Sequence, residues 1–251
     1  SLRAFLAFPT WLWFIVDGRP SLQVDQALEF LALAGCAFAG LAVLGVHHVL
    51  VFIVLYTNYL SLFLLGQRWL GFQWDIFLLE TGALLLLYCP TCTLRAQGAV
   101  PPVAWLLRAL MAKFMYMNGV VKVTANCPTW KHLTALEYHF ASTCLPTSEA
   151  WIHHQLPPVI LRLGVAVMFV AELAAPWLLL CPIRAVRQVG VLVQAVLQLG
   201  IMVTGNYNWF NLHSLVLLLP AWGDDDYGDD GSNSRAALFL RPARFWGRVW
   251  C

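Results

Sequence analysis

The chain has 251 residues, of which 60% are hydrophobic and 11% are charged, and its mean hydropathy is +0.70. Soluble domains carry about 25% charged residues, so this composition excludes a water-soluble globule. The net charge of +2 comes from scattered side chains, which argues against nucleic acid as a partner. We therefore expect an all-α fold, a polytopic membrane helix bundle of about six or seven transmembrane helices, one of them broken.

The first 65 residues predict an interfacial segment and two membrane spans. Residues 1–25 mix aromatic side chains with prolines and charges, a pattern typical of a segment that lies on the membrane surface. A span needs about 20 mainly apolar residues. Ala27–Val46 and Val49–Leu65 meet that requirement and are predicted to be the first two spans.

Two further spans are predicted before residue 124, and both carry charged side chains. Asp75–Tyr88 is the third span, and Val103–Val123 is the fourth. Pro101 and Pro102 precede the fourth, where a proline without an N–H costs least. The polar intramembrane set, including one residue of a later span, is Asp75, Glu80, Arg108, Lys113, Lys122 and Glu172.

Each intramembrane charge costs at least about 2.5 kcal/mol at a helix centre and is rarely left unpaired. One interpretation is a polar cavity in which Lys122 acts as a base, because burial lowers the pKa of a lysine. The other, which we favour, is ion pairing between spans together with side chains that reach the interface. On this second interpretation the chain has no catalytic residue. On the first, Lys122 is the candidate.

Residues 124–157 form the longest polar stretch before the tail and are predicted to be an extramembrane loop. Cys127 and Cys144 are predicted to form a disulfide, worth roughly 3 kcal/mol in the chain-entropy estimate. The alternatives are two unpaired thiols, or pairing with cysteines elsewhere. The loop's histidines, with Glu137, match no zinc template. We therefore predict no metal site and no cofactor, and expect His139 to form hydrogen bonds within the loop.

The next segment predicts a fifth and a sixth span and then a break. Pro158–Leu180 and Val189–Thr204 are the spans, and GNYNWFN follows. The broken-helix motif is formed by Gly205, Asn206, Tyr207, Asn208 and Asn211. Inside a membrane such a stretch needs internal hydrogen-bond partners, so it either lines a polar cavity, as in transporters, or breaks the helix for packing. Leu212–Leu219 alone is too short to cross.

The chain is expected to divide into three parts: an interfacial luminal segment (1–25), the transmembrane bundle with its loop (26–222), and an acidic linker with a basic tail (223–251). Because no signal peptide precedes the first span, we expect the chain to be internal to a longer protein. Arg184 and Arg187, with Arg95 two crossings earlier, favour the cytoplasmic side. The loop 124–157 would then be luminal, where a disulfide persists.

Several stretches together resemble the lipase maturation factor family. They are FQWDIFLLETG (72–82), NGVVKVTANCPTWKHLTALEYHF (118–140), LPTSEAWIHHQLPP (145–158), FVAELAAPWLLLCPIR (169–184) and LVQAVLQLGIMVTGNYNWFNL (192–212). The resemblance implies a multi-pass protein of the endoplasmic reticulum membrane that helps secreted clients, notably dimeric lipases, to fold and assemble. It also directs attention to Tyr138 and His139, in the luminal ALEYH block.

A more distant similarity links the NGVVKV segment to the vitamin-K-dependent gamma-glutamyl carboxylase group. Lys122 falls on a functional lysine of that group, whereas Val121 replaces the first lysine of its pair. Three hypotheses follow: a non-enzymatic folding and assembly factor, with the lipid bilayer and secreted client proteins such as lipases as partners; a carboxylase-like enzyme that uses Lys122 as a base on a lipid-soluble cofactor; and a transporter built around Glu80, Glu172 and the helix break. The oligomeric state stays open.

Overall fold

The computed structural model describes residues 9–16, 24–88, 101–143, 145–207 and 209–223. These residues are all-helical, without a strand, and they fall into two compact units, the first through Val103 and the second from Ala104. The predicted all-α membrane fold is therefore confirmed. Most of the interfacial segment and almost all of the linker and tail lie outside the described residues.

The first unit is built from long apolar helices. Its elements are α2 (Leu12–Val16), α3 (Val24–Val43), α4 (Val49–Gly66), the 3₁₀ turn η1 (Gln67–Trp69) and α5 (Gln73–Tyr88). Asn58 of α4, which is 4% exposed, donates to the Leu31 carbonyl of α3 at 2.6 Å. Asp75 lies in the first turn of α5, where a carboxylate is favoured, and it accepts from the Tyr59 hydroxyl at 2.6 Å. Buried polar groups thus hold these helices together.

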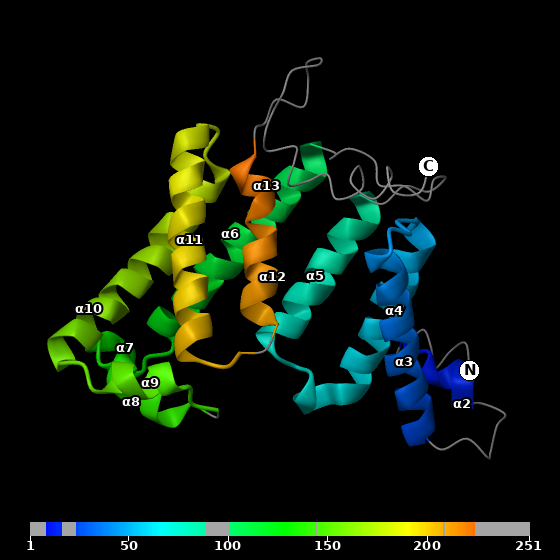
Figure 1. Cartoon of the computed structure of the whole chain (residues 1–251), viewed down its shortest axis with the longest axis horizontal. Coiled ribbons are helices and arrows are strands. Elements are labelled where there is room, and N and C mark those ends of the chain that lie inside the picture. Colours follow the sequence, from blue (N-terminus) through cyan, green and yellow to red (C-terminus); the bar gives the residue numbers. More distant parts are fainter. Residues whose placement is uncertain (1–8, 17–23, 89–100, 144, 208, 224–251) are drawn as a thin grey trace. The chain divides into compact units, whose positions relative to one another are not determined.

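The second unit contains the remaining helices (Figure 1). They are α6 (Pro101–Thr124), α7 (Pro128–Lys131), α8 (Ala135–Ser142), α9 (Ser148–His154), α10 (Pro158–Phe169), the π-helical turn η2 (Val170–Ala174), the 3₁₀ segment η3 (Ala175–Leu180), α11 (Arg184–Thr204), α12 (Phe210–Leu217) and α13 (Leu219–Trp222). The predicted fifth span is therefore one run, α10–η2–η3, with changes in winding. Pro176 lies in its 3₁₀ part, where it is buried, and a proline cannot continue regular α-helical bonding.

Among the described residues, four helical segments are long and apolar enough to cross a membrane. They are Val24–Val43, Val49–Trp69, Pro158–Leu180 and Arg184–Thr204, and Phe210–Trp222 is a shorter apolar segment. All four overlap predicted spans. The third and fourth predicted spans, α5 and α6, are not in this set, so the total of six or seven crossings stays a prediction.

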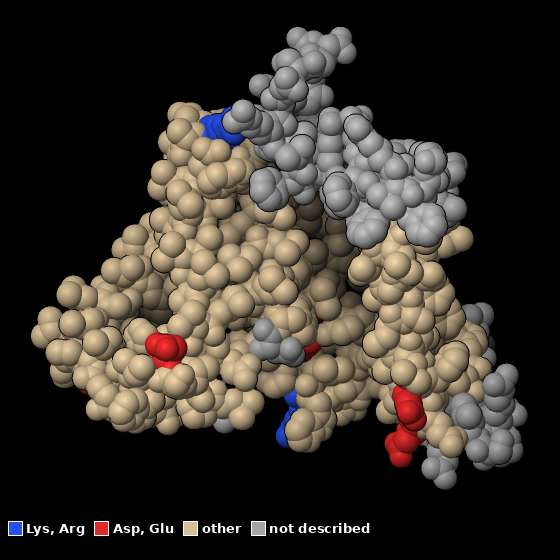
Figure 2. Space-filling view, in the orientation of Figure 1, with Lys and Arg blue, Asp and Glu red and all other residues tan. Residues whose placement is uncertain are grey.

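Helix α11 has the reverse of the pattern expected for a helix in water. Its buried face carries Arg187, Gln194 and Gln198, whereas its exposed face carries apolar side chains such as Leu192 and Val196. A soluble helix turns its apolar face inward. On the face of the molecule in Figure 2, Lys, Arg, Asp and Glu cover only small areas of the described surface. Both observations indicate a hydrocarbon environment.

The backbones of α11 and η3 approach each other closely at Gly190. A Cβ at Gly190 would lie 2.7 Å from Leu178 Cβ and 3.2 Å from backbone atoms. We expect Gly190→Ala to lower the free energy of unfolding by about 1–3 kcal/mol, because the two backbones would have to separate. Gly200→Ala on the same helix is the matched control. Its Cβ would meet no atom within 4 Å, so helix propensity should make that variant neutral to about 1 kcal/mol more stable. Thermal unfolding in detergent would measure both, and equal effects would contradict the packing argument.

Candidate functional site

The three short helices α7, α8 and α9 form a cap at one end of the second unit, beside the ends of α10 and α11 (Figure 1). Its core consists of Phe140, Ala150 and Leu161, with Leu136 and Leu156 packed against them. Thr147 accepts a hydrogen bond from the Ala150 N–H at 3.1 Å as the N-cap of α9, and its hydroxyl donates to the Val203 carbonyl of α11 at 3.0 Å. The predicted loop 124–157 is therefore largely helical, and it is fastened to the bundle.

Lys122 and Glu172 form an ion pair beside this cap. Lys122 Nζ donates to both carboxylate oxygens of Glu172, at 2.5 and 2.6 Å. The side chain of Glu172 is 4% exposed and that of Lys122 is 22% exposed. Gly119, one turn before Lys122, leaves room for the turn that carries Glu172, because a Cβ there would lie 2.6 Å from Leu173 Cδ2. The pair thus joins α6 to η2 at close range.

The π-helical turn that carries Glu172 also accepts a hydrogen bond from a third helix through a backbone carbonyl. Gln194 of α11 donates its side-chain amide to the Ala171 carbonyl at 2.6 Å. Inside a membrane a carbonyl released from helical bonding needs such an internal donor. Two polar side chains from two different helices therefore support one turn of the α10–η2–η3 run.

Aromatic and histidine side chains complete the surroundings of Lys122. Its ammonium lies 5.5 Å from the centroid of the Trp130 ring, a cation–π contact. The Tyr207 hydroxyl and His139 Nε2 are 3.1 Å apart, and their rings stack with an interplanar angle of 8°. We call Lys122, Glu172, Trp130, His139 and Tyr207 the Lys122 cluster. It gathers residues from α6, α7, α8, η2 and the connection after α11.

Burial lowers the pKa of His139 below its ordinary value of 6.5, and the positive charge of Lys122 lowers it further. Between the folded pKa and about pH 6.5, the His139 side chain is therefore protonated in the unfolded chain and neutral in the folded chain. The stability that comes from neutral His139 is present above that pH and is lost as the pH falls toward the folded pKa. We expect the unfolding temperature to drop between about pH 7.5 and about pH 5.5. His139→Gln should show a smaller drop, and an identical drop in both proteins would contradict the assignment.

The six predicted intramembrane charges are divided between the two units. Asp75 and Glu80 belong to the first unit, on α5, whereas the other four lie in the second. Within the second unit, Lys122 and Glu172 are joined by an ion pair. The transporter hypothesis, which relies on Glu80 together with Glu172, stays a prediction.

Arginine side chains bind backbone carbonyls at the end of the second unit opposite the cap. Arg108 Nε donates to the Pro220 carbonyl at 2.7 Å. Arg187, which is 1% exposed, donates through Nε to Ala221 at 2.8 Å and through Nη2 to Gly223 at 2.8 Å. Its Nη1 donates to the carbonyls of Cys181 and Pro182 at 3.0 and 3.3 Å. We call this the arginine end.

The predicted helix break lies between the end of α11 at Thr204 and the start of α12 at Phe210. Gly205 is buried, Asn206 is exposed and Tyr207 contacts His139. Asn211 is 1% exposed and donates to Gln198 Oε1 at 2.6 Å. Asn208 lies outside the described residues. The Asn211 amide therefore bonds to another side chain inside the second unit, and the role of the broken-helix motif stays a prediction.

The remaining predicted site residues are separate from one another. Tyr138 is exposed on α8. Cys127 Sγ lies 3.0 Å from the Thr129 hydroxyl oxygen, and Cys144 lies outside the described residues, so their disulfide stays a prediction. No group of three or more His, Cys, Asp or Glu side chains suited to a metal ion occurs in the part of the chain that the structure describes.

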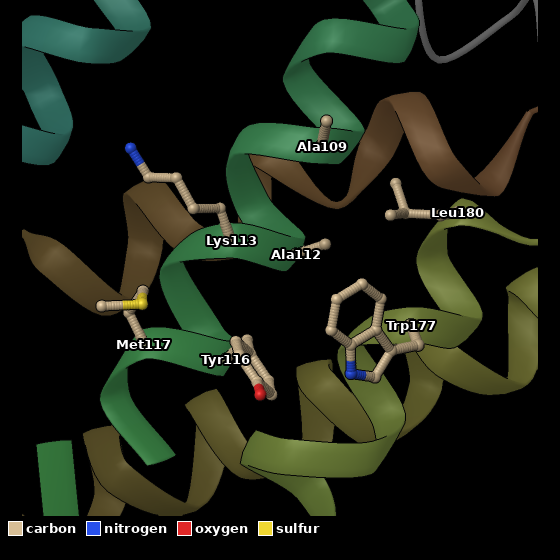
Figure 3. Close-up of a pocket in the computed structure, with 7 residues that line it drawn as sticks. All are labelled: Ala109, Ala112, Lys113, Tyr116, Met117, Trp177 and Leu180. Carbon is tan, nitrogen blue, oxygen red and sulfur yellow. The ribbon is translucent and has the colours of Figure 1, made fainter. Parts of the chain in front are cut away.

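A pocket of about 190 Å³ lies between α6 and η3 and does not involve the Lys122 cluster. In Figure 3 the Tyr116 ring lies next to the Trp177 ring, while the Lys113 side chain points away from Trp177. The two ring centroids are 5.1 Å apart. The remaining lining residues are Ala109, Ala112, Met117 and Leu180. The lining is mainly apolar, so the pocket suits hydrocarbon better than a charged substrate.

Sequence reasoning from charged residues did not find the uncharged polar side chains in the core of the second unit. Gln194, Gln198 and Ser214 are each 0% exposed. The spacing of the two glutamines by four residues places them on one face of α11. In a segment otherwise apolar enough to span a membrane, that spacing could have identified the buried face.

Comparison with known proteins gives one consistent family. The family described as lipase maturation factor transmembrane domain matches residues 1–228. Lipase maturation factor 2 of Mus musculus is 42% identical over 222 residues, which cover 83% of this chain and 31% of the mouse protein. Lipase maturation factor 2 of Homo sapiens is 41% identical over 242 residues, covering 90% of the chain and 34% of that protein.

A second human relative is more distant. Lipase maturation factor 1 of Homo sapiens is 29% identical over 233 residues, which cover 91% of the chain and 40% of the relative. The chain thus spans well under half the length of these curated relatives. No solved structure matches the chain.

Proposed function

The chain belongs to the lipase maturation factor family, and we propose that it is the membrane-embedded part of an endoplasmic reticulum factor that supports the folding and assembly of secreted clients such as lipases. The observation that carries this proposal is the family match across residues 1–228. The chain is a multi-pass membrane protein, and the part that the structure describes contains four helices long and apolar enough to span a bilayer. The names of its relatives state a role in lipase maturation.

The polar groups of the second unit favour a structural role over catalysis. The Lys122 ammonium is occupied by the Glu172 carboxylate at 2.5 and 2.6 Å. We infer from this geometry that the ammonium joins two helices as an ion pair rather than serving a substrate as a base. We therefore propose that this unit anchors and positions the parts of the whole protein that meet the client.

We further propose that the cap faces the lumen and the arginine end faces the cytoplasm. Arg184 and Arg187 lie at the start of α11, and Arg108 lies near the same end. Lys and Arg near span ends favour the cytoplasmic side. The cap would then lie on the client's side of the membrane.

Engineered glycosylation tests this orientation. Pro146→Asn creates an Asn-Thr-Ser acceptor at the exposed start of α9. In the full-length protein expressed in cells, we expect this site to be glycosylated. A matched acceptor at the other end, made by Arg184→Asn with Val186→Thr, should stay unmodified. Glycosylation of the second site and not the first would show that the arginine end faces the lumen, which contradicts the proposed orientation.

The proposed role in lipase maturation is tested by removing the full-length protein from a lipase-secreting cell line and then re-expressing it. We expect secreted lipase activity to fall severalfold while the amount of lipase synthesised stays constant, and re-expression should restore it. A secreted protein that folds without the factor serves as the control client. Unchanged lipase activity after removal would refute the proposal, and an equal loss of the control client would point to a general secretion defect.

A further inference from the structure

Four uncharged polar side chains form a buried seam between α11 and α12, which we call the amide seam. They are Gln194, Gln198, Asn211 and Ser214, and they are 0%, 0%, 1% and 0% exposed. The two helices are consecutive and run antiparallel (Figure 1). The seam therefore lies inside the second unit, within segments that are otherwise apolar.

The register of the two helices places these side chains at matching levels. Asn211 donates to Gln198 Oε1 at 2.6 Å, which fixes one level. Gln194 lies one turn before Gln198, and Ser214 lies about one turn after Asn211. Because the helices are antiparallel and rise about 1.5 Å per residue, Gln194 and Ser214 come to nearly the same level.

Each side-chain amide of the seam donates one hydrogen bond to an acceptor in the second unit. Gln194 Nε2 donates to the Ala171 carbonyl at 2.6 Å, and Asn211 Nδ2 donates to Gln198. Gln198 Nε2 donates to Met115 Sδ at 3.3 Å. Three oxygens of the seam, in contrast, have no hydrogen-bond partner among the described residues: Gln194 Oε1, Asn211 Oδ1 and Ser214 Oγ.

We propose that the amide seam binds water. The two orphaned amide oxygens can only accept hydrogen bonds, and the serine hydroxyl can donate or accept, so the missing partner must be a donor. Burial of all four side chains restricts that donor to a molecule of about the size of water. A buried polar site with two to four partners is where internal water is found, whereas apolar cavities stay dry. The seam contains no carboxylate, so a cation is the less suitable occupant.

Two methionines on α6 offer a matched pair of reporters. Met115 is 1% exposed and contacts Gln198, whereas Met111, one turn earlier, is 0% exposed. Radiolysis of water produces hydroxyl radicals where water is bound, and methionine sulfur is readily oxidised. Radiolytic footprinting of the full-length protein in lipid nanodiscs should therefore label Met115 severalfold faster than Met111. Equal labelling of the two methionines would overturn the proposal.

Removing seam groups gives a second measurement. In Gln194→Leu combined with Ser214→Ala, labelling of Met115 should fall to the level of Met111. If this variant fails to fold, Ser214→Ala alone should still reduce the labelling of Met115 relative to Met111. Replacement of sodium by choline should leave the labelling and the unfolding temperature unchanged. Sodium-dependent stability would identify a cation as the occupant and would also overturn the proposal.

Discussion

Lys122→Met should lower the free energy of unfolding of the second unit by about 3 kcal/mol, because it leaves the Glu172 carboxylate buried without its partner. The carboxylate side chain is 4% exposed and takes both of its short contacts from Lys122. Replacing both members by apolar groups removes the stranded charge. We therefore expect Lys122→Met with Glu172→Leu to recover most of the stability lost in the single variant, as measured by thermal unfolding in detergent.

This double variant separates the structural role of Lys122 from a catalytic one. If the pair only joins α6 to η2, the double variant should restore lipase secretion together with stability. If Lys122 acts as a base on a lipid-soluble cofactor, secretion should stay lost while the protein folds normally. Lys113→Met, which changes an exposed lysine of the same helix, serves as the matched control. The single Lys122→Met variant cannot decide between the two roles, because misfolding alone would abolish secretion.

Arg187→Met should be the most damaging single change at the arginine end, with a loss of about 4 kcal/mol. One guanidinium, 1% exposed, donates to the carbonyls of Cys181, Pro182, Ala221 and Gly223. Hydrogen bonds to a charged group contribute about 1.5–3 kcal/mol each and are not additive. The carbonyls belong to the segment after η3 and to the C-terminal end of α13. Without the guanidinium, we expect both segments to lose their attachment to α11.

Two companion variants control the Arg187 result. Arg184→Met changes an exposed arginine one turn earlier on the same helix and should lower the free energy of unfolding by no more than about 1 kcal/mol, the upper range for an exposed charge pair. Arg187→Lys retains the charge but lacks the fork of donors, so it should recover only part of the stability. Limited proteolysis near residue 223 would report detachment of α13. If Arg184→Met lowered the free energy of unfolding as much as Arg187→Met does, the effect would come from the loss of positive charge and not from the hydrogen bonds.

Composition and hydropathy were sufficient to predict the membrane class and the positions of the long apolar helices. Four predicted spans overlap the four helices that are apolar enough to cross a bilayer. Two details were not available from hydropathy. One is the pair of winding changes: residues of η2 contact Lys122 and Gln194 from other helices, and η3 contains the buried Pro176. The helices of the cap are short, and their apolar faces become meaningful only when packed on Leu161.

The candidate site was only partly predictable, because a one-dimensional pattern gives residue types and not their partners. Intramembrane charge identified Lys122 and Glu172 but gave equal weight to Asp75 and Glu80, which the fold places in the other unit. Tyr207 was selected as part of a helix break. Its contact with His139, 68 residues away, depends on the cap folding back toward the end of α11.

The polar inner face of α11 has a consequence for biosynthesis. Arg187, Gln194 and Gln198 would meet lipid if α11 left the translocation channel alone, and such side chains are unfavourable at the centre of a lone helix. Three of their partner groups, Asn211 and the carbonyls of Ala221 and Gly223, are synthesised later. We therefore expect α11 to wait beside the channel and to enter the bilayer together with α12 and α13. A nascent chain truncated after Thr204 should remain extractable by alkaline carbonate to a greater extent than one that extends beyond Gly223, and equal extraction would show that α11 enters alone.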